Sequence, residues 1–135
     1  MSSPSRHRVI AGGLGLLLSV VAGLGLGTVA GAQTTREFHV SAHKYAFVVD
    51  GQPTPRIEVQ QGDIVQITFS ADDIPHSFTI DEYRIAKRAE PGKPVKFEFR
   101  ADKVTDGPVI FYCNLTLDDG CRKMRGELVV TKRHP

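Results

Sequence analysis

Two cysteines and a methionine lie on one short loop near the C-terminus of this 135-residue chain. Cys113 ends an apolar run rich in β-forming residues, and a second such run begins at Arg125. The polar loop between them carries Cys121 and Met124. Thiolate and thioether sulfurs are soft donors that select soft metals such as copper. The spacing therefore indicates a soft-metal site on a loop between two strands.

A further donor comes from the middle of the chain, where His76 follows an acid-containing loop over residues 70–75. An imidazole nitrogen is also a common copper ligand. If folding brings His76 to the sulfur loop, the chain can hold one copper ion. The candidate metal ligands are His76, Cys113, Cys121 and Met124. A set with three sulfurs favours Cu(I), and the two thiols must be reduced and deprotonated to bind it.

The N-terminal stretch has the composition of a leader sequence. Arg6-His7-Arg8 is positively charged, and an uncharged, almost wholly apolar run extends from Val9 to Ala32. The small residues Ala30-Gly31-Ala32 suit a cleavage site. We expect residues 1–32 to be a signal peptide and residues 33–135 to form one exported, periplasmic or otherwise extracytoplasmic domain. An uncleaved membrane anchor is the alternative, because about 20 apolar residues can span a bilayer.

Export opens a second interpretation of the cysteine pair. Disulfides persist in oxidising compartments, and Cys113 and Cys121 are close enough in sequence to be joined. Closing so small a loop would stabilise the fold by about 2.6 kcal/mol on a chain-entropy estimate. A copper site and a copper-free interaction domain closed by a Cys113–Cys121 disulfide are therefore both open.

The charge balance argues against nucleic acid as a partner. The chain has 17 Lys+Arg and 15 Asp+Glu, and residues 1–32 account for two arginines and no acids. The remaining domain is thus formally neutral, with no basic stripe. A membrane would be contacted only through residues 9–32, if they are not cleaved. Near the sulfur loop, Arg122, Lys123 and Arg125 could dock an acidic redox or copper-delivery protein.

Short segments with strand character fill the rest of the chain. Residues 56–60 and 95–100 alternate apolar and polar side chains, as half-buried strands do. Turns rich in Gly, Pro and Asp separate such segments, and no long amphipathic helix competes with them. Residues 81–89 suit either a short strand or a helical turn. About seven strands predict an all-β fold, a Greek-key antiparallel β-sandwich.

The motifs around the candidate ligands resemble the cupredoxin family, in particular the copper-binding domain of cytochrome c oxidase subunit II and its small bacterial relatives. Three stretches carry the resemblance, which extends from about Glu37 to Val130: Asp73-Ile74-Pro75-His76-Ser77-Phe78-Thr79-Ile80, the Pro91-Gly92 turn, and Tyr112-Cys113 with Met124-Arg125-Gly126. The resemblance implies the same β-sandwich, copper as the cofactor, and a site built from one mid-chain histidine and the last loop.

The ligand loop departs from the family pattern. The oxidase loop reads Cys, three residues, Cys, three residues, His, two residues, Met. When its first cysteine is aligned with Cys113, its second cysteine, its histidine and its methionine fall on Leu117, Cys121 and Met124. The loop holds no histidine, whereas blue-copper sites use two histidines and one cysteine. We therefore expect an atypical His-Cys-Cys-Met site that transfers electrons or carries copper, and no enzyme activity. His39 and His43 are weaker candidate ligands.

Overall fold

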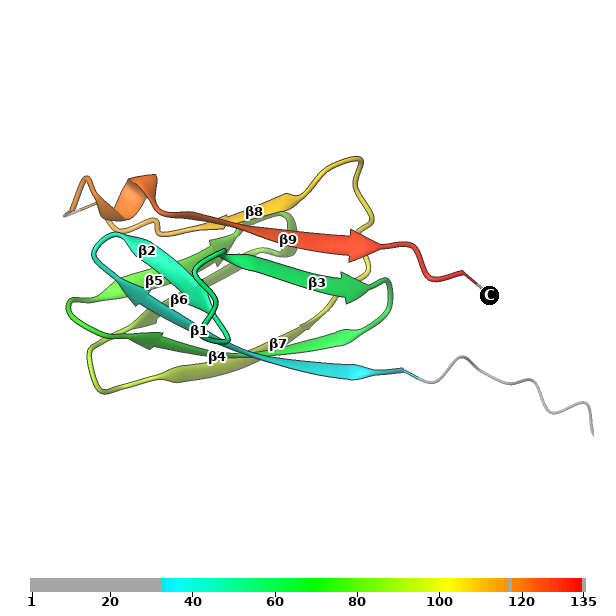
Figure 1. Ribbon diagram of the computed structural model, residues 1–135, viewed down its shortest axis with the longest axis horizontal. Helices are drawn as coiled ribbons and strands as arrows, with labels where there is room; N and C mark the ends of the chain where they lie inside the picture. Colours follow the sequence, from blue (N-terminus) through cyan, green and yellow to red (C-terminus); the bar gives the residue numbers. More distant parts are fainter. Residues whose placement is uncertain (1–32, 117, 135) are drawn as a thin grey trace, which may run out of the picture. The chain divides into compact units, whose positions relative to one another are not determined.

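Nine strands form two sheets in the computed structural model, which describes residues 33–116 and 118–134 (Figure 1). The four-stranded sheet has the order β2-β1-β4-β7, and the five-stranded sheet has the order β3-β9-β8-β5-β6. The first sheet comprises β1 (Thr35–His43), β2 (Ala46–Val49), β4 (Ile64–Ala71) and β7 (Val95–Arg100). The second comprises β3 (Arg56–Gln60), β5 (His76–Ile80), β6 (Ile85–Ala89), β8 (Val109–Tyr112) and β9 (Arg125–Thr131).

The predicted all-β sandwich is confirmed, with one correction. The sheets are mixed rather than purely antiparallel, because β1 pairs with β4 and β3 pairs with β9 in parallel. Parallel neighbours cannot be joined by a hairpin. Here the chain leaves the first sheet after β2, adds β3 to the second sheet, and returns as β4 beside β1. The alternation of apolar and polar residues along a strand predicts which face is buried. It does not specify whether neighbouring strands run parallel or antiparallel.

Residues 81–89 form both of the structures that the sequence allowed. A short 3-10 helix, η1 (Asp81–Tyr83), is followed by β6, and Arg84 between them has a left-handed backbone. A second short helix, η2 (Cys121–Lys123), lies in the loop between β8 and β9. The described residues contain no helix long and apolar enough to cross a membrane. The leader expected over residues 1–32 lies outside the described part of the chain.

Aromatic side chains from both sheets fill the core between them. Phe47 and Phe69 come from the first sheet, Phe78 and Phe111 from the second, and all four are fully buried. The rings of Phe78 and Phe111 stack with centroids 4.7 Å apart, and Phe47 meets Phe111 edge-on at 5.2 Å. Such pairs add to the stability already gained by burial. They also fix β5 against β8, which are the two strands that position the candidate ligands.

Candidate metal centre

The antiparallel pairing of β5 and β8 brings the candidate ligands together. Thr79 lies opposite Tyr112, so the start of β5 and the end of β8 meet at the same end of the sheet. His76 is the first residue of β5, and Cys113 directly follows β8. After the loop, η2 returns Cys121 to the same place. A ring nitrogen and the two sulfur atoms all lie within 4.8 Å of one another.

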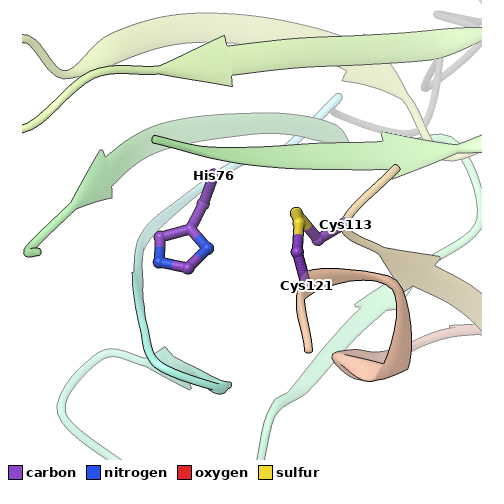
Figure 2. A group of neighbouring side chains, drawn as sticks. All are labelled: His76, Cys113 and Cys121. Carbon is purple, nitrogen blue, oxygen red and sulfur yellow. A yellow bond between two sulfur atoms is a disulfide. The ribbon is translucent and has the colours of Figure 1, made fainter. Parts of the chain in front are cut away.

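All three side chains are fully buried, with 0% of each residue exposed. Figure 2 shows the imidazole of His76 beside the joined sulfurs of the cysteines. The ring nitrogen next to the attachment carbon, Nδ1, is on the side of the cysteines, and Nε2 is on the far side. Nδ1 is buried and has no hydrogen-bond partner among the described residues. A buried polar atom without a partner normally costs free energy.

The other ring nitrogen of His76 is held by an acid from the preceding loop. Nε2 lies 2.8 Å from Oδ1 of Asp73, which also accepts the N–H of Ile74 at 2.7 Å. The second carboxylate oxygen, Oδ2, accepts the N–H of Lys44 at 2.7 Å. Burial by itself would raise the pKa of Asp73, but these hydrogen bonds to its ionised form lower the pKa to about 2. The carboxylate is therefore ionised at neutral pH.

Ser77 holds the first cysteine from the opposite strand. Its backbone N–H lies 3.3 Å from Sγ of Cys113, and its Oγ lies 3.7 Å from the same sulfur. The hydroxyl makes shorter contacts with Asn114: it donates to Oδ1 at 2.6 Å and accepts the backbone N–H at 2.8 Å. Because the hydroxyl has one hydrogen, the N–H of Ser77 is the main donor to the sulfur.

The two cysteines are joined as a disulfide, with their Cα atoms 5.3 Å apart. This is the pairing that the sequence left open as an alternative to metal binding. A disulfide offers no thiolate, so the donor set that suits a soft metal exists only after reduction. The donors nevertheless suit a soft metal in kind and lie close together: a buried imidazole nitrogen without a hydrogen-bond partner among the described residues is on the side of two buried sulfurs. The structure thus brings three of the predicted ligands together with the two sulfurs oxidised, and metal binding by them stays a prediction.

The fourth predicted ligand, Met124, follows η2 and is 2% exposed. Its backbone N–H bonds to the carbonyl of Cys121 at 3.0 Å, which closes the turn of η2. This holds Met124 next to the sulfur loop, but its role as a ligand stays a prediction. The weaker candidates do not join the cluster of described side chains: His39 is exposed on β1, and His43 is half-buried at its end.

The predicted basic patch is partly engaged within the domain. Arg122 pairs with Asp119 at 2.5 Å. The guanidinium of Arg125 lies over the ring of Tyr112, 5.2 Å from its centroid, and donates to the carbonyls of Arg122 and Met124. Lys123 is exposed. Two of the three basic side chains therefore already have partners within the domain, and the use of the patch in docking stays a prediction.

Three neighbours of the site received no role from the sequence. Asp73 and Ser77 belong to the motif around His76. The sequence signal that could have identified Asp73 is an acid three residues before a histidine. Tyr45 was not detectable, because it comes from the β1–β2 turn. Its ring occupies the space that a Cβ at Gly120 would need, and Gly120 directly precedes Cys121 in the sequence. Only the fold brings this turn to the sulfur loop.

The chain has the fold of the cupredoxins, as the motifs predicted, because the solved structures that match it share this fold. A heme-copper terminal oxidase dimer matches with 21% identity over 76% of this chain and 67% of that chain, at a TM-score of 0.63. The periplasmic domain of cytochrome oxidase subunit II from Bradyrhizobium japonicum matches with 14% identity over 71% of this chain and 83% of its own, at 0.61.

A third match shows a subunit II domain in a redox complex. It is the mixed disulfide intermediate between a thioredoxin-like protein and subunit II of cytochrome c oxidase, with 14% identity over 78% of this chain and 87% of that chain, at a TM-score of 0.56. No protein-family model and no curated protein matches the chain. At these identities the likeness is one of fold.

Proposed function

We propose that this chain is an exported copper-binding protein that holds one copper ion after its disulfide is reduced. The ligands are His76, Cys113 and Cys121, with Met124 as the fourth. The ion would serve electron transfer or the carriage of copper outside the cytoplasm. The cupredoxin fold supports the general class, and the donor set of this chain supports the atypical site.

The buried Nδ1 of His76 carries the proposal. It is buried, lies on the side of the two sulfurs, and has no hydrogen-bond partner among the described residues. A protein that needed only a disulfide at this place would gain by filling it with an apolar side chain, because an unpaired buried nitrogen is destabilising. A bound ion would satisfy the nitrogen. Copper itself would supply a one-electron couple whose Cu(I) form accepts thiolate and thioether ligands.

Loading requires a reductant for the disulfide. One dithiol gives two electrons and two protons: its first thiolate attacks one sulfur of the Cys113–Cys121 bond, and its second thiol releases the protein as a free dithiol while the donor becomes a disulfide. We propose a thioredoxin-like protein as this donor. The mixed disulfide of subunit II with a thioredoxin-like protein supports that class of partner.

An apolar hollow beside the site suits such a contact. It is lined by residues that flank the candidate ligands in sequence, and a single arginine lies at its side: Ile74, Pro75, Leu115, Thr116, Asp118 and Arg88. Because both sulfurs are buried, a reductant reaches them only when the loop that carries η2 moves. Docking at this hollow would place a partner next to that loop.

Export and the lack of catalysis are parts of the same proposal. A disulfide persists in an oxidising compartment, which agrees with the leader expected at the N-terminus. The complete burial of the three donors leaves no exposed ligand position for a substrate, which favours electron transfer or carriage over an enzyme. Assays of thiol reductase and copper oxidase turnover should therefore give background rates.

A second function has its own support in the structure. The Cys113–Cys121 bond is formed, so the chain can be a copper-free interaction domain in which the disulfide fixes the last loop. In that case the His76 nitrogen would be tolerated rather than used. The two functions differ in what happens after reduction, since only the first gains a ligand.

Copper titration of the reduced and the oxidised protein separates them. We expect the reduced protein to bind one equivalent of Cu(I) against a competing chelator, and the oxidised protein to bind none at the same chelator concentration. Cys113→Ser and His76→Ala should weaken binding, whereas His39→Ala, which changes an exposed histidine of β1, should not. Retention of no copper by the fully reduced, folded protein would favour the copper-free domain.

A further inference from the structure

Asp73 links the histidine of the site to two other backbone segments. Its Oδ1 contacts Nε2 of His76 and the N–H of Ile74, and its Oδ2 accepts the N–H of Lys44 from the β1–β2 turn. Three neighbours therefore share one carboxylate. The residue is exposed at the surface, whereas the His76 ring that it contacts is fully buried. Asp72, the equally exposed acid directly before it, makes no side-chain contact with His76 and offers a natural comparison.

The chemistry of the carboxylate decides which ring nitrogen carries the proton. An ionised carboxylate is only an acceptor, so Nε2 of His76 must donate to it. In a neutral imidazole the other nitrogen, Nδ1, then has a free lone pair. That lone pair is on the side of the two sulfurs. A ring held in the opposite tautomer would present an N–H to the site, and an N–H cannot bind a metal.

The same carboxylate also bonds to the turn that packs against the sulfur loop. By accepting the N–H of Lys44, Asp73 fixes the turn that carries Tyr45, whose ring covers Gly120 beside Cys121. The orientation of the histidine and the cover over the sulfur loop are thus tied to one residue. Outer contacts of this kind orient metal-binding histidines and support their basicity.

We propose that Asp73 is the positioning residue of the site: it locks His76 in the tautomer with a free Nδ1 and anchors the β1–β2 turn over the sulfur loop. The part that concerns copper affinity rests on the proposed function, but the tautomer is a property of the metal-free protein. Asp73 touches no copper ion and acts through the imidazole.

The substitution Asp73→Asn tests this with little change in size. An amide has one acceptor oxygen in place of two, so it cannot serve Lys44 on one side and His76 with Ile74 on the other. If the amide nitrogen faces the ring, it donates to Nε2, and the imidazole proton moves to Nδ1. The matched control is Asp72→Asn, which removes the same charge one position earlier.

The first measurement uses the oxidised, metal-free protein labelled with nitrogen-15. The ring signals of His76 distinguish a protonated from an unprotonated nitrogen. We expect Nε2 protonated and Nδ1 unprotonated in the wild type and in Asp72→Asn, and a shift of the proton toward Nδ1 in Asp73→Asn. The exchange of the Lys44 amide should also become faster. A wild-type spectrum with the proton on Nδ1 would overturn the proposal, even if the variant did not fold.

The second measurement is the Cu(I) affinity of the reduced proteins in competition with a chelator. Loss of an outer contact to a metal-binding histidine lowers affinity on the order of 10- to 100-fold. We expect a loss of this size for Asp73→Asn relative to Asp72→Asn. Equal affinities with an unchanged tautomer would refute the positioning role. If the wild type binds no copper, the proposed function fails, and the tautomer still decides the role of Asp73.

Discussion

The backbone N–H of Ser77 lies 3.3 Å from Sγ of Cys113, although 36 residues separate the two in sequence. The antiparallel pairing of β5 and β8 produces this contact. It places the residue after the candidate histidine against the first candidate sulfur, so a main-chain N–H of β5 links the histidine side of the site to the sulfur loop. The Ser77 hydroxyl adds two hydrogen bonds to Asn114.

Ser77→Ala should lower the free energy of unfolding by about 1 kcal/mol, since it removes a largely buried hydroxyl that both donates and accepts. The N–H contact to Cys113 stays in place. Urea denaturation measures the change. Ser70→Ala, at a half-buried serine of β4, is the control and should change stability by less than about 0.5 kcal/mol. Equal effects of the two substitutions would show that the Asn114 contacts add nothing.

Gly126→Ala should destabilise the core by about 1–3 kcal/mol. Gly126 of β9 lies opposite Phe111 of β8, and a Cβ there would overlap the Phe111 ring, which is fully buried and cannot move aside freely. The shift in the midpoint of urea unfolding gives the magnitude. Gly107→Ala is the matched control, because a Cβ at Gly107 meets nothing within 4 Å. A wild-type midpoint for Gly126→Ala would contradict the close packing of Gly126 against the Phe111 ring.

Thr79→Val should leave the stability unchanged or raise it. The Thr79 hydroxyl is buried and has no hydrogen-bond partner among the described residues, so a methyl group of similar size removes a polar atom without breaking a bond. Thr131→Val makes the contrasting change. The Thr131 hydroxyl donates to the carbonyl of Val59 at 3.2 Å, and its loss should lower the free energy of unfolding by about 0.5–1.5 kcal/mol. Thermal melting compares the two. A clear loss for Thr79→Val would indicate that its hydroxyl is bonded to buried water.

Acid should weaken the fold through Asp73. Burial alone would raise the pKa of this carboxyl, but the hydrogen bonds from Lys44, His76 and Ile74 lower it to about 2. Its stabilising contribution is therefore complete above the unfolded pKa of about 4 and is lost as pH falls through 2. The stability difference between wild type and Asp73→Asn should shrink over this window. A carboxyl NMR titration with an Asp73 midpoint near 4 would contradict it.

Tyr112 should ionise at higher pH than an ordinary tyrosine. Its hydroxyl donates to both carboxylate oxygens of Asp81, at 2.9 and 3.1 Å, and this hydrogen bond raises the pKa of Tyr112, with burial and the charge of Asp81 adding to it. Asp81→Asn should move the pKa of Tyr112 down toward 10. Carbon-13 labelling of the tyrosine rings resolves Tyr112 from the two other tyrosines in a pH titration. An unchanged Tyr112 midpoint in Asp81→Asn would exclude the contact.

The residue types and their order along the chain predicted most of the fold. Alternating segments such as 56–60 and 95–100 predicted strands that the structure contains, because side chains on one face of a strand must be apolar to be buried. The motif around His76 and the sulfur loop predicted the cupredoxin fold. Local chemistry also fixed the candidate donors, since only a few residue types can bind a soft metal.

The tertiary structure alone decided strand direction and the state of the site. The parallel pairing of β1 with β4 depends on where the chain crosses between sheets, which no local pattern encodes. The approach of His76 to both sulfurs depends on the pairing of β5 with β8, and the contacts of Asp73 depend on a turn from another part of the chain. Sequence names the groups that can react, whereas long-range packing sets the distances between them and therefore their bonding.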